Sequence, residues 1–252
     1  MKIKIFGERN SGTNALLQML KINSGSEFYP GTMSEISAFQ TKKVQLASRL
    51  GLDVLKKESL IDAVFHGNIL TERWKHSATY VTNKELQEIK VSKFIFTVRH
   101  PMSWLIGLYK KPYHMLVDKP ASLTEFADID WRVVGRENLK KTYYKPLALL
   151  EEKLLSYLDL MDKLEREGLA YKIVKFEEFV SNQQTTFEYL KEFVDAPTYG
   201  FTELTKSTKE SSKNSQYYSN YYSNEVWKEE FPEVNSIKNT LSKDLLSAFG
   251  YE

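Results

Sequence analysis

The chain has 252 residues, 27% of them charged, and a formal net charge of +2. A charge so close to zero gives no reason to expect nucleic acid or an anionic membrane as a partner. The sequence has no cysteine, which excludes disulfides, thiolate metal sites and a cysteine nucleophile. No apolar run approaches the roughly 18 residues of a membrane span, and residues 1–6 do not resemble a signal peptide. We therefore expect a cytoplasmic protein without internal repeats.

The chain opens on a pattern that predicts a strand, a polar turn and a helix. Isoleucines alternate with lysines over residues 2–6, and apolar residues at 15–20 have helical spacing. The turn between them is bracketed by Gly7 and Gly12. Such a turn directs backbone N–H groups and the positive end of the helix dipole to one point, where an anion binds. The alternative is an ordinary polar turn between a strand and a helix.

The residues of this turn suit a phosphate or sulfate group. Its glycines have the spacing of a nucleotide-binding P-loop, but the next residue is Thr13, where a Walker loop has lysine. Arg9 supplies a positive charge instead, and Ser11 and Thr13 add hydroxyl donors. We expect an anionic ligand to be bound here by Arg9, Asn10, Ser11, Gly12, Thr13 and Asn14.

A second candidate position follows the clearest later strand, residues 94–98 (FIFTV), which runs into Arg99, His100 and Pro101. Proline is favoured in the first turn of a helix, so a helix is expected over 101–113. Arg99 then lies just past the carboxyl end of a parallel-type strand, where open α/β sheets bind their ligands. A P-loop NTPase has an aspartate there to hold magnesium. A cation in this place favours an anionic ligand and argues against a metal.

The remaining pattern alternates strands with helices. Further strands are expected at 61–66 and 171–176. Helices are expected at 146–167 and 185–194, with one in 34–57 and one or two in 226–251. This order predicts one α/β domain over residues 1–252, a three-layer P-loop fold in which helices flank a central, mostly parallel sheet.

The irregular segments have two interpretations each. Residues 23–33 are expected to be a loop. Insertions near 24–60 and 115–145, the second with short elements, either shape an acceptor pocket or are surface excursions. Residues 205–224 are rich in Ser, Asn, Lys and Tyr and are expected to be a loop, either a flap over an anionic ligand or a solvated connector.

Two further side chains have both a catalytic and a structural interpretation. His76 follows Trp74 and Lys75, and a lone histidine is more often structural than catalytic. Glu177 follows the strand at 171–176, and a carboxylate that caps a helix or braces the phosphate turn is favoured over a catalytic one.

Taken together, the motifs resemble the P-loop sulfotransferase family and look most similar to a bacterial-type branch. Residues 9–14 (RNSGTN) resemble the first donor-binding loop of that family, and 96–101 (FTVRHP) resemble its second donor motif. Lys75 and His76 resemble the segment that carries the catalytic histidine. Residues 174–180 (VKFEEFV) resemble a strand and acidic helix nearer the C-terminus. The resemblance covers about two-thirds of the chain, in the order and spacing of the family.

The resemblance implies a function and roles for these residues. The donor would be 3′-phosphoadenosine 5′-phosphosulfate (PAPS), the product PAP, with no metal. A sulfuryl group would pass to a hydroxyl or amine of an acceptor, a carbohydrate or glycoconjugate. His76 would be the general base, with His66, His100 and Glu8 as weaker candidates. Arg9 would act at the reacting group.

The resemblance also implies a site for the donor's 3′-phosphate, and here the sequence departs from the family. Arg99 would bind this phosphate, together with Lys or Ser side chains from 206–213. The family usually has Ser eight residues after that arginine, where this chain has Gly107. Ser103 lies four residues earlier and is the candidate substitute.

Two other functions remain open. A nucleotide-dependent kinase would need Lys at position 13 and an acidic magnesium ligand, and neither is evident. A non-catalytic protein that binds a nucleotide or an anionic glycan is the third possibility, and Gly107 keeps it open. Oligomeric state is not encoded in any of these motifs.

Overall fold

A computed structural model describes residues 1–89, 92–196, 200–205, 213–237 and 241–251. Within these residues a central sheet has the order β2-β1-β3-β6, and each neighbouring pair is parallel. Its strands are β1 (Lys2–Gly7), β2 (Glu27–Phe28), β3 (Ser92–Val98) and β6 (Tyr171–Lys175). The predicted α/β class, with a parallel sheet between helices, is confirmed. A short antiparallel pair, β4 (Trp131–Arg132) and β5 (Tyr143–Tyr144), lies apart from it.

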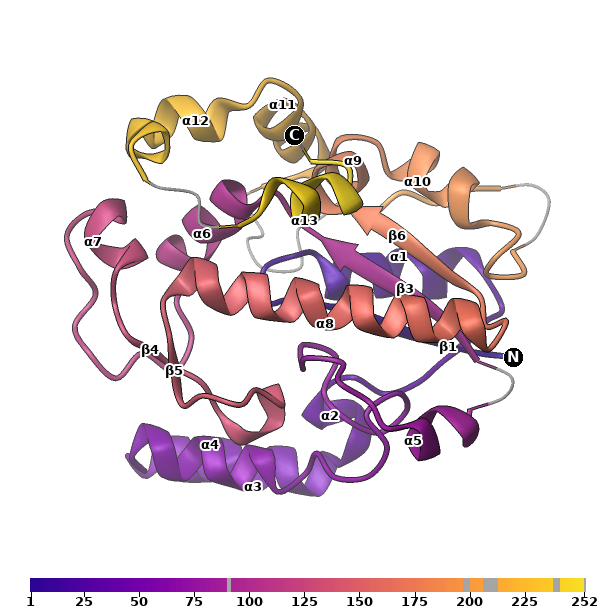
Figure 1. Ribbon diagram of the computed structural model, residues 1–252, viewed down its shortest axis with the longest axis horizontal. Coiled ribbons are helices and arrows are strands. Elements are labelled where there is room, and N and C mark those ends of the chain that lie inside the picture. Colours follow the sequence, from indigo (N-terminus) through magenta and orange to yellow (C-terminus); the bar gives the residue numbers. More distant parts are fainter. Residues whose placement is uncertain (90–91, 197–199, 206–212, 238–240, 252) are drawn as a thin grey trace.

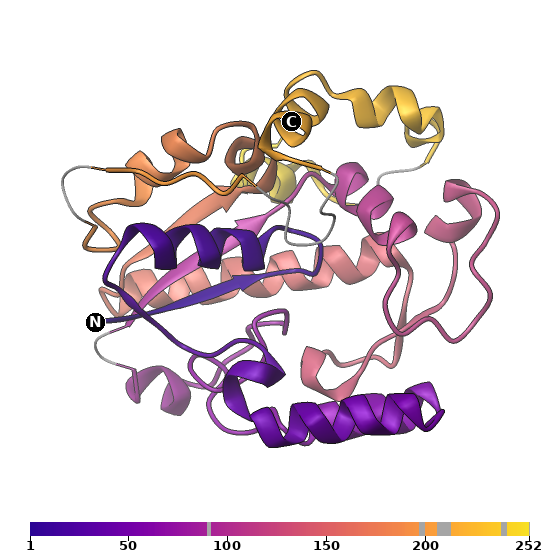
Figure 2. The same cartoon turned by 180° about the vertical axis from the view of Figure 1, so that it is seen from behind.

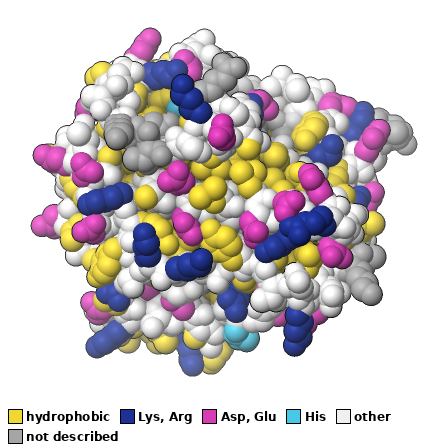
Figure 3. Space-filling model, in the orientation of Figure 1, with side chains coloured by type: hydrophobic (Ala, Val, Ile, Leu, Met, Phe, Trp, Pro, Cys, Tyr) yellow, Lys and Arg dark blue, Asp and Glu magenta, His cyan; other side chains and the backbone are white. Residues whose placement is uncertain are grey.

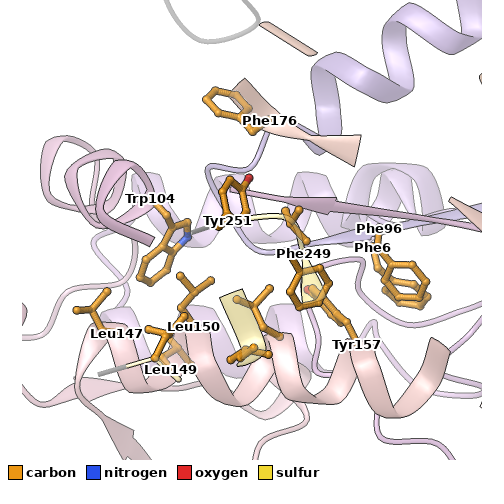
Figure 4. Close-up of a cluster of buried hydrophobic side chains, with 14 of the residues drawn as sticks. Phe6, Phe96, Trp104, Leu147, Leu149, Leu150, Tyr157, Phe176, Phe249 and Tyr251 are labelled. Atoms are coloured by element: carbon orange, nitrogen blue, oxygen red, sulfur yellow. The ribbon is translucent and has the colours of Figure 1, made fainter. Parts of the chain in front are cut away.

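Helices cover both faces of the sheet. The long helix α8 (Pro146–Arg166) crosses one face (Figure 1), and α1 (Thr13–Asn23) crosses the other (Figure 2). Side chains of β1 and β3 therefore pack in both directions. Phe6 and Phe96 stack with ring centroids 5.9 Å apart, next to Tyr157 of α8 (Figure 4). Ile5 packs with Leu16 in a second cluster on the α1 side.

The alternation of lysine and isoleucine in β1 does not mark a solvent face. Lys2 is exposed, but Lys4 is fully buried. Its Nζ donates to the carbonyl oxygens of Pro30, Thr71 (3.3 Å) and Arg73 (2.8 Å). Burial lowers the pKa of Lys4 to about 7. The side chain thus joins two distant loops to a strand that is buried on both faces, as strands of parallel sheets are.

The strand predicted at 61–66 is wrong. Helix α4 (Val54–Asp62) runs into this segment, and Val64 and Phe65 then turn to pack with Trp74. The fourth strand of the sheet is instead β2, inside the predicted loop 23–33, where the two strand residues pair with Lys2 and Ile3. A short apolar run indicates burial, but it does not distinguish a strand from a buried turn.

Residues 34–57 hold parts of three helices rather than one. They are α2 (Met33–Ile36), α3 (Ala38–Arg49) and the start of α4. Two capping side chains divide them. Ser37 accepts a hydrogen bond from the N–H of Gln40, and Asp53 accepts one from the N–H of Leu55. Each cap satisfies backbone groups at a new helix start. Helices α3 and α4 form a hairpin at the lower edge of Figure 1.

The loop predicted at 205–224 is wrong over its second half. Residues 215–223 form the helix α11 (Ser215–Ser223), whereas 206–212 lie outside the described residues. Tyr217 and Tyr221 stack one helical turn apart, as do Tyr218 and Tyr222. Their spacing is helical, and this signal outweighs the polar composition that favoured a loop.

The other predicted helices are present with shifted ends. Helix α6 (Pro101–Lys110) begins at the expected proline, α8 ends next to the expected stop Gly168, and α10 (Gln183–Leu190) overlaps the predicted 185–194. The remaining helices are α5 (Asn83–Gln87), α7 (Leu123–Ala127), η1 (Gly135–Glu137), α9 (Phe176–Ser181), α12 (Val226–Glu230), η2 (Pro232–Asn235) and α13 (Lys243–Ala248). Among the described residues, none of the helices has the length and apolar character to cross a membrane.

Candidate functional site

The turn between β1 and α1 has the geometry of an anion cradle. Asn10 and Gly12 have positive φ angles of 66° and 77°, which reverse the chain before α1 begins at Thr13. Gly12 is the N-cap of α1 and has no side chain, so no side-chain cap closes this end of the helix. A Cβ on Gly12 would lie 2.7 Å from Cδ2 of Phe176. The first turn of α1 thus leaves N–H groups for an anion.

Two side chains from the neighbouring strand and helix hold this turn in place. Arg99, at the end of β3, donates from Nη1 to the carbonyl oxygen of Asn10 at 2.6 Å. Trp104 of α6 donates from Nε1 to the carbonyl oxygen of Arg9 at 2.8 Å. The two predicted motifs, 9–14 and 96–101, therefore meet in space.

Arg99 is buried and connects three elements. Its Nε donates to Ser103 Oγ at 2.8 Å, its Nη2 donates to the Tyr222 hydroxyl at 2.7 Å, and its guanidinium carbon lies 4.3 Å from the Phe176 ring centroid. With the bond to Asn10, three of five N–H donors are used by described residues. Ser103 is fully buried behind Arg99, so it orients the guanidinium.

Gly107 makes room for that guanidinium. A Cβ at Gly107 would lie 2.8 Å from Nη1 of Arg99 and 3.3 Å from Cζ. A serine at position 107, which the resembled sulfotransferase family usually has, would therefore occupy space that Arg99 fills. The geometry explains why glycine suits this position with Arg99 in this conformation.

A cavity of about 190 Å³ opens beside Arg99 and the N-terminus of α1. Its wall combines cationic and aromatic side chains, which suits a phosphate-bearing ligand with a planar ring. The cations are Arg99, Lys110, Lys111 and Lys213, and the aromatic residues are Phe176, Phe179, Tyr217, Tyr218, Tyr221 and Tyr222. Most of the aromatic wall comes from α11, which sequence reasoning missed. Of the predicted segment 206–213, only Lys213 is described.

His76 lies on another side of the same turn. Its Nδ1 is 2.5 Å from the carbonyl oxygen of Gly7, the last residue of β1. A carbonyl only accepts, so Nδ1 carries the proton and Nε2 of the neutral ring has a lone pair. Burial, with the charges of Lys75 and Arg9, lowers the pKa of His76 well below 6.5. The imidazole is therefore neutral at pH 7 and able to accept a proton at Nε2.

Arg9 is held by aromatic rings. Its guanidinium carbon lies 3.8 Å from the ring centroid of Tyr113 and 4.5 Å from that of Trp74. Within the described residues its side chain makes no hydrogen bond, so its N–H donors remain for a ligand. Arg9 and His76 both contact Trp74, whose ring centroid is 4.9 Å from that of His76.

Lys75 brings a further cation to α1. This side chain is buried, and its Nζ donates to Oδ1 of Asn14 in the first turn of the helix. Burial lowers the pKa of Lys75 to about 8. The sequence motif included Lys75 only as the neighbour of His76. Its approach to a helix that lies 61 positions earlier in the chain has no local signal.

A buried charge network supports the His76 side of the turn. Lys153 of α8 donates to the carbonyl oxygen of His76 at 2.9 Å and forms ion pairs with Glu8 and Glu137. Tyr113 donates to Glu8 at 3.0 Å. Burial raises the pKa of Glu8. At Glu137 burial acts in the same direction, but Lys153 and the other nearby positive groups together outweigh it and lower the pKa. The only sequence signal was a lysine within the apolar stripe of α8.

The weaker base candidates lie elsewhere or are already engaged. His66 is exposed and contacts the carbonyl oxygen of Ala63. His100 is the N-cap of α6, where Nδ1 accepts from the N–H of Met102. Glu177 accepts from the backbone N–H of His100 and from the Tyr251 hydroxyl, so it braces the start of α6. Among the described residues, no three His, Asp or Glu side chains are grouped to hold a metal ion.

Comparisons with known proteins give structural likenesses but no match to a family model or a curated sequence. Among solved structures it is similar to a sulfotransferase domain from the curacin biosynthetic pathway, with 14% identity and a TM-score of 0.47 over 99% of this chain and 97% of that one.

Proposed function

We propose that the protein is a sulfotransferase that moves a sulfuryl group from PAPS to a hydroxyl or amine of an acceptor. The observation that carries the proposal is the hydrogen bond between His76 Nδ1 and the carbonyl oxygen of Gly7. It holds a neutral imidazole, with its lone pair on Nε2, beside a turn that has anion-binding geometry. A general base next to an anion site suits the transfer of a charged group to a hydroxyl.

The cavity beside Arg99 supports PAPS as the donor, because it lies between two places that suit phosphate groups, the turn before α1 and Arg99. In this proposal the N–H groups of the turn and of the first turn of α1 bind the phosphosulfate, with Asn10, Ser11, Gly12, Thr13 and Asn14 around it. Arg99 binds the 3′-phosphate through the two N–H donors that described residues leave unused, and Ser103 keeps Arg99 oriented. The tyrosine wall of α11 stacks on the adenine.

In the proposed transfer step, His76 accepts a proton and the cationic side chains stabilise the leaving group. The acceptor O–H gives its proton to Nε2 of His76 as its oxygen forms a bond to sulfur. The bond between sulfur and the bridging phosphate oxygen breaks, and the leaving phosphate takes the charge. The N-terminus of α1, Arg9 and Lys75 stabilise this charge, in the manner of groups that assist in-line phosphoryl transfer.

The acceptor in this proposal is a hydroxyl of a carbohydrate or glycoconjugate. Arg9 has five N–H donors that no described residue uses, so those that do not contact the leaving phosphate suit sugar hydroxyls. The ring of Tyr113, partly exposed next to Arg9, suits the C–H face of a sugar. Both lie on the His76 side of the turn, where the acceptor must approach the base.

A nucleotide-dependent kinase is the second candidate, and one contact favours it. Lys75 places an ammonium group at the first turn of α1, near where a Walker lysine acts. Position 13 is threonine, however, and the residue after β3 is Arg99, where a magnesium-binding aspartate would stand. We therefore rank phosphoryl transfer below sulfuryl transfer.

Thermal melting with PAP or with magnesium ATP separates these candidates. A ligand at about 100 times its Kd stabilises the fold by about 2.7 kcal/mol, a rise of roughly 5–10 °C for a chain of this size. We expect this rise with PAP, and we expect Arg99→Gln to abolish it. Transfer of labelled sulfate from PAPS to a panel of sugars is then the direct assay.

Two results would contradict the proposal. A rise with magnesium ATP alone would favour the kinase. Binding of PAP without sulfate transfer to any hydroxyl or amine in a broad panel would favour a non-catalytic binding protein.

A further inference from the structure

Helix α3 and its C-cap residue, Leu50, direct large apolar side chains away from the protein. Phe39, Leu46 and Leu50 are 65%, 57% and 77% exposed. At about 100° per residue these positions share one stripe of the helix, opposite the buried Val44. Single exposed apolar residues are ordinary on a protein surface. Three in one stripe form an exposed apolar row, a feature typical of surfaces that contact a partner or a membrane.

Cationic side chains flank this apolar stripe. The Nζ of Lys43 lies 4.9 Å from the ring centroid of Phe39, and Lys42 and Arg49 are exposed on the same helix. Helix α4 adds Lys56 and Lys57. Along the lower edge of Figure 3, where Figure 1 places this hairpin, Lys or Arg side chains lie next to hydrophobic ones.

The carboxylates of the hairpin do little to neutralise these cations. Between residues 42 and 57 the sole acidic residue is Asp53, whose side chain caps α4. The next, Glu58, is buried in an ion pair with Arg136. Five cations therefore face one exposed carboxylate, although the whole chain has a formal net charge of only +2. The near-neutral total conceals a local basic surface.

We propose that the α3–α4 hairpin docks on the surface of an anionic lipid bilayer. An interfacial helix combines an apolar stripe, which enters the acyl boundary, with flanking lysines and arginines that contact anionic headgroups. A second copy of the chain is less suited to cover the stripe, because pairing two hairpins would bring like charges together. The proposal does not depend on the proposed catalytic function.

The hairpin is joined to the candidate site by a buried arginine. Arg136 of η1 pairs with Glu58 and, from Nη1, with Asp62 Oδ1 at 2.6 Å. The next residue, Glu137, belongs to the charge network around Lys153. A docked hairpin would therefore hold the His76 side of the site near the bilayer.

Sedimentation with lipid vesicles tests the proposal. The full chain is mixed with phosphatidylcholine vesicles that contain no anionic lipid or about 30% phosphatidylserine. We expect roughly tenfold or tighter binding to the anionic vesicles, with a loss of binding between about 0.1 M and 0.5 M salt, because salt screens the attraction.

Two triple variants separate the apolar and the electrostatic contributions. One replaces the stripe (Phe39→Ser, Leu46→Ser and Leu50→Ser), and the other removes cations (Lys42→Gln, Lys43→Gln and Arg49→Gln). Each is expected to weaken binding to anionic vesicles by roughly tenfold or more. All six side chains are exposed, so thermal melting should show an unchanged fold.

A matched control and a reporter complete the test. Leu155→Ser with Tyr189→Ser removes two exposed apolar side chains elsewhere and should leave vesicle binding unchanged. In Phe39→Trp, brominated lipid should quench the added indole, because the stripe enters the acyl boundary.

Several results would overturn the proposal. They are absent vesicle binding, equal binding to neutral and anionic vesicles, or full binding by both triple variants. A dimer in light scattering that the serine variant abolishes, without vesicle binding, would assign the stripe to a second copy of the chain instead.

Discussion

The two sides of the turn between β1 and α1 are held by different forces. On the cavity side, Arg99 is fixed by hydrogen bonds to a backbone carbonyl and two hydroxyls, and it keeps donors for a ligand. On the His76 side, Lys153 sits between two buried carboxylates. Arg99 thus keeps N–H donors for an anionic ligand, whereas Lys153 already has carboxylate partners within the protein. We therefore expect substitutions of Arg99 to change ligand affinity and substitutions of Lys153 to change the stability of the fold.

The largest effect on turnover is expected from His76→Ala. Loss of a general base costs roughly 100- to 10,000-fold in rate. Binding of PAP, measured by thermal shift, should persist because Arg99 is untouched. The control His66→Ala removes an exposed histidine and should retain full activity. Unchanged sulfate transfer in His76→Ala would give the base to another group.

The largest effect on stability is expected from Lys153→Met. It leaves Glu8 and Glu137 buried without their cation, which costs about 3–5 kcal/mol. The free energy of unfolding in urea measures this. Adding Glu137→Gln to the variant should recover part of the loss. The control Arg166→Gln, at an exposed pair on the same helix, should change stability by at most about 1 kcal/mol.

Arg99→Lys tests the cavity side. Lysine cannot reproduce three directed bonds from one planar group, so affinity for PAP should fall roughly 10- to 100-fold. Isothermal titration gives the change, and Arg166→Lys is the surface control. Undiminished affinity would show that Arg99 shapes the turn without contacting the ligand.

Gly107→Ser tests whether Arg99 needs a glycine at position 107 to keep its conformation. The new Cβ would crowd Nη1 at 2.8 Å, so we expect PAP affinity to fall about fivefold as Arg99 shifts. Gly25→Ser, with no atom within 4 Å of the added Cβ, is the control. A gain in affinity would mean that serine adds a phosphate contact here.

The smallest effects are expected from pH. His76 acts as a base only when neutral, so kcat/KM should fall on acidification through its pKa, which lies below 6.5. Lys75 loses half of its charge at about pH 8, so the rate should fall about twofold there. Lys75→Arg should move this alkaline limb to higher pH. An identical alkaline limb in Lys75→Arg would exclude Lys75 as its source.

Much of the fold was predictable because its signals are local. The strand at 94–98, the proline that begins α6 and the apolar stripe of α8 depend on near neighbours in the chain. Other elements depend on distant partners. The two residues of β2 are a strand only because they pair with Lys2 and Ile3. The apolar run at 61–66 is buried against Trp74 instead of in the sheet.

The candidate site likewise has parts that local sequence predicted and parts that it did not. The motifs predicted an anion-binding turn at 9–14, placed Arg99 after a strand and gave His76 as a candidate base. Sequence reasoning missed Lys153 because a lone lysine in a helix usually lies in solvent. The tyrosine wall of α11 was missed because composition was given more weight than helical spacing.

The sequence by itself determined the β1–turn–α1 unit, the class of the sheet and the residue types available for binding an anion. These follow from periodicity and from the backbone freedom of glycine, which act over a few residues. Only the tertiary structure decided which charges meet. It buried Lys4 and Lys153, brought Lys75 to α1 and left the stripe of α3 exposed. Burial and electrostatic pairing depend on contacts between residues that are far apart in the chain, and local sequence does not encode those contacts.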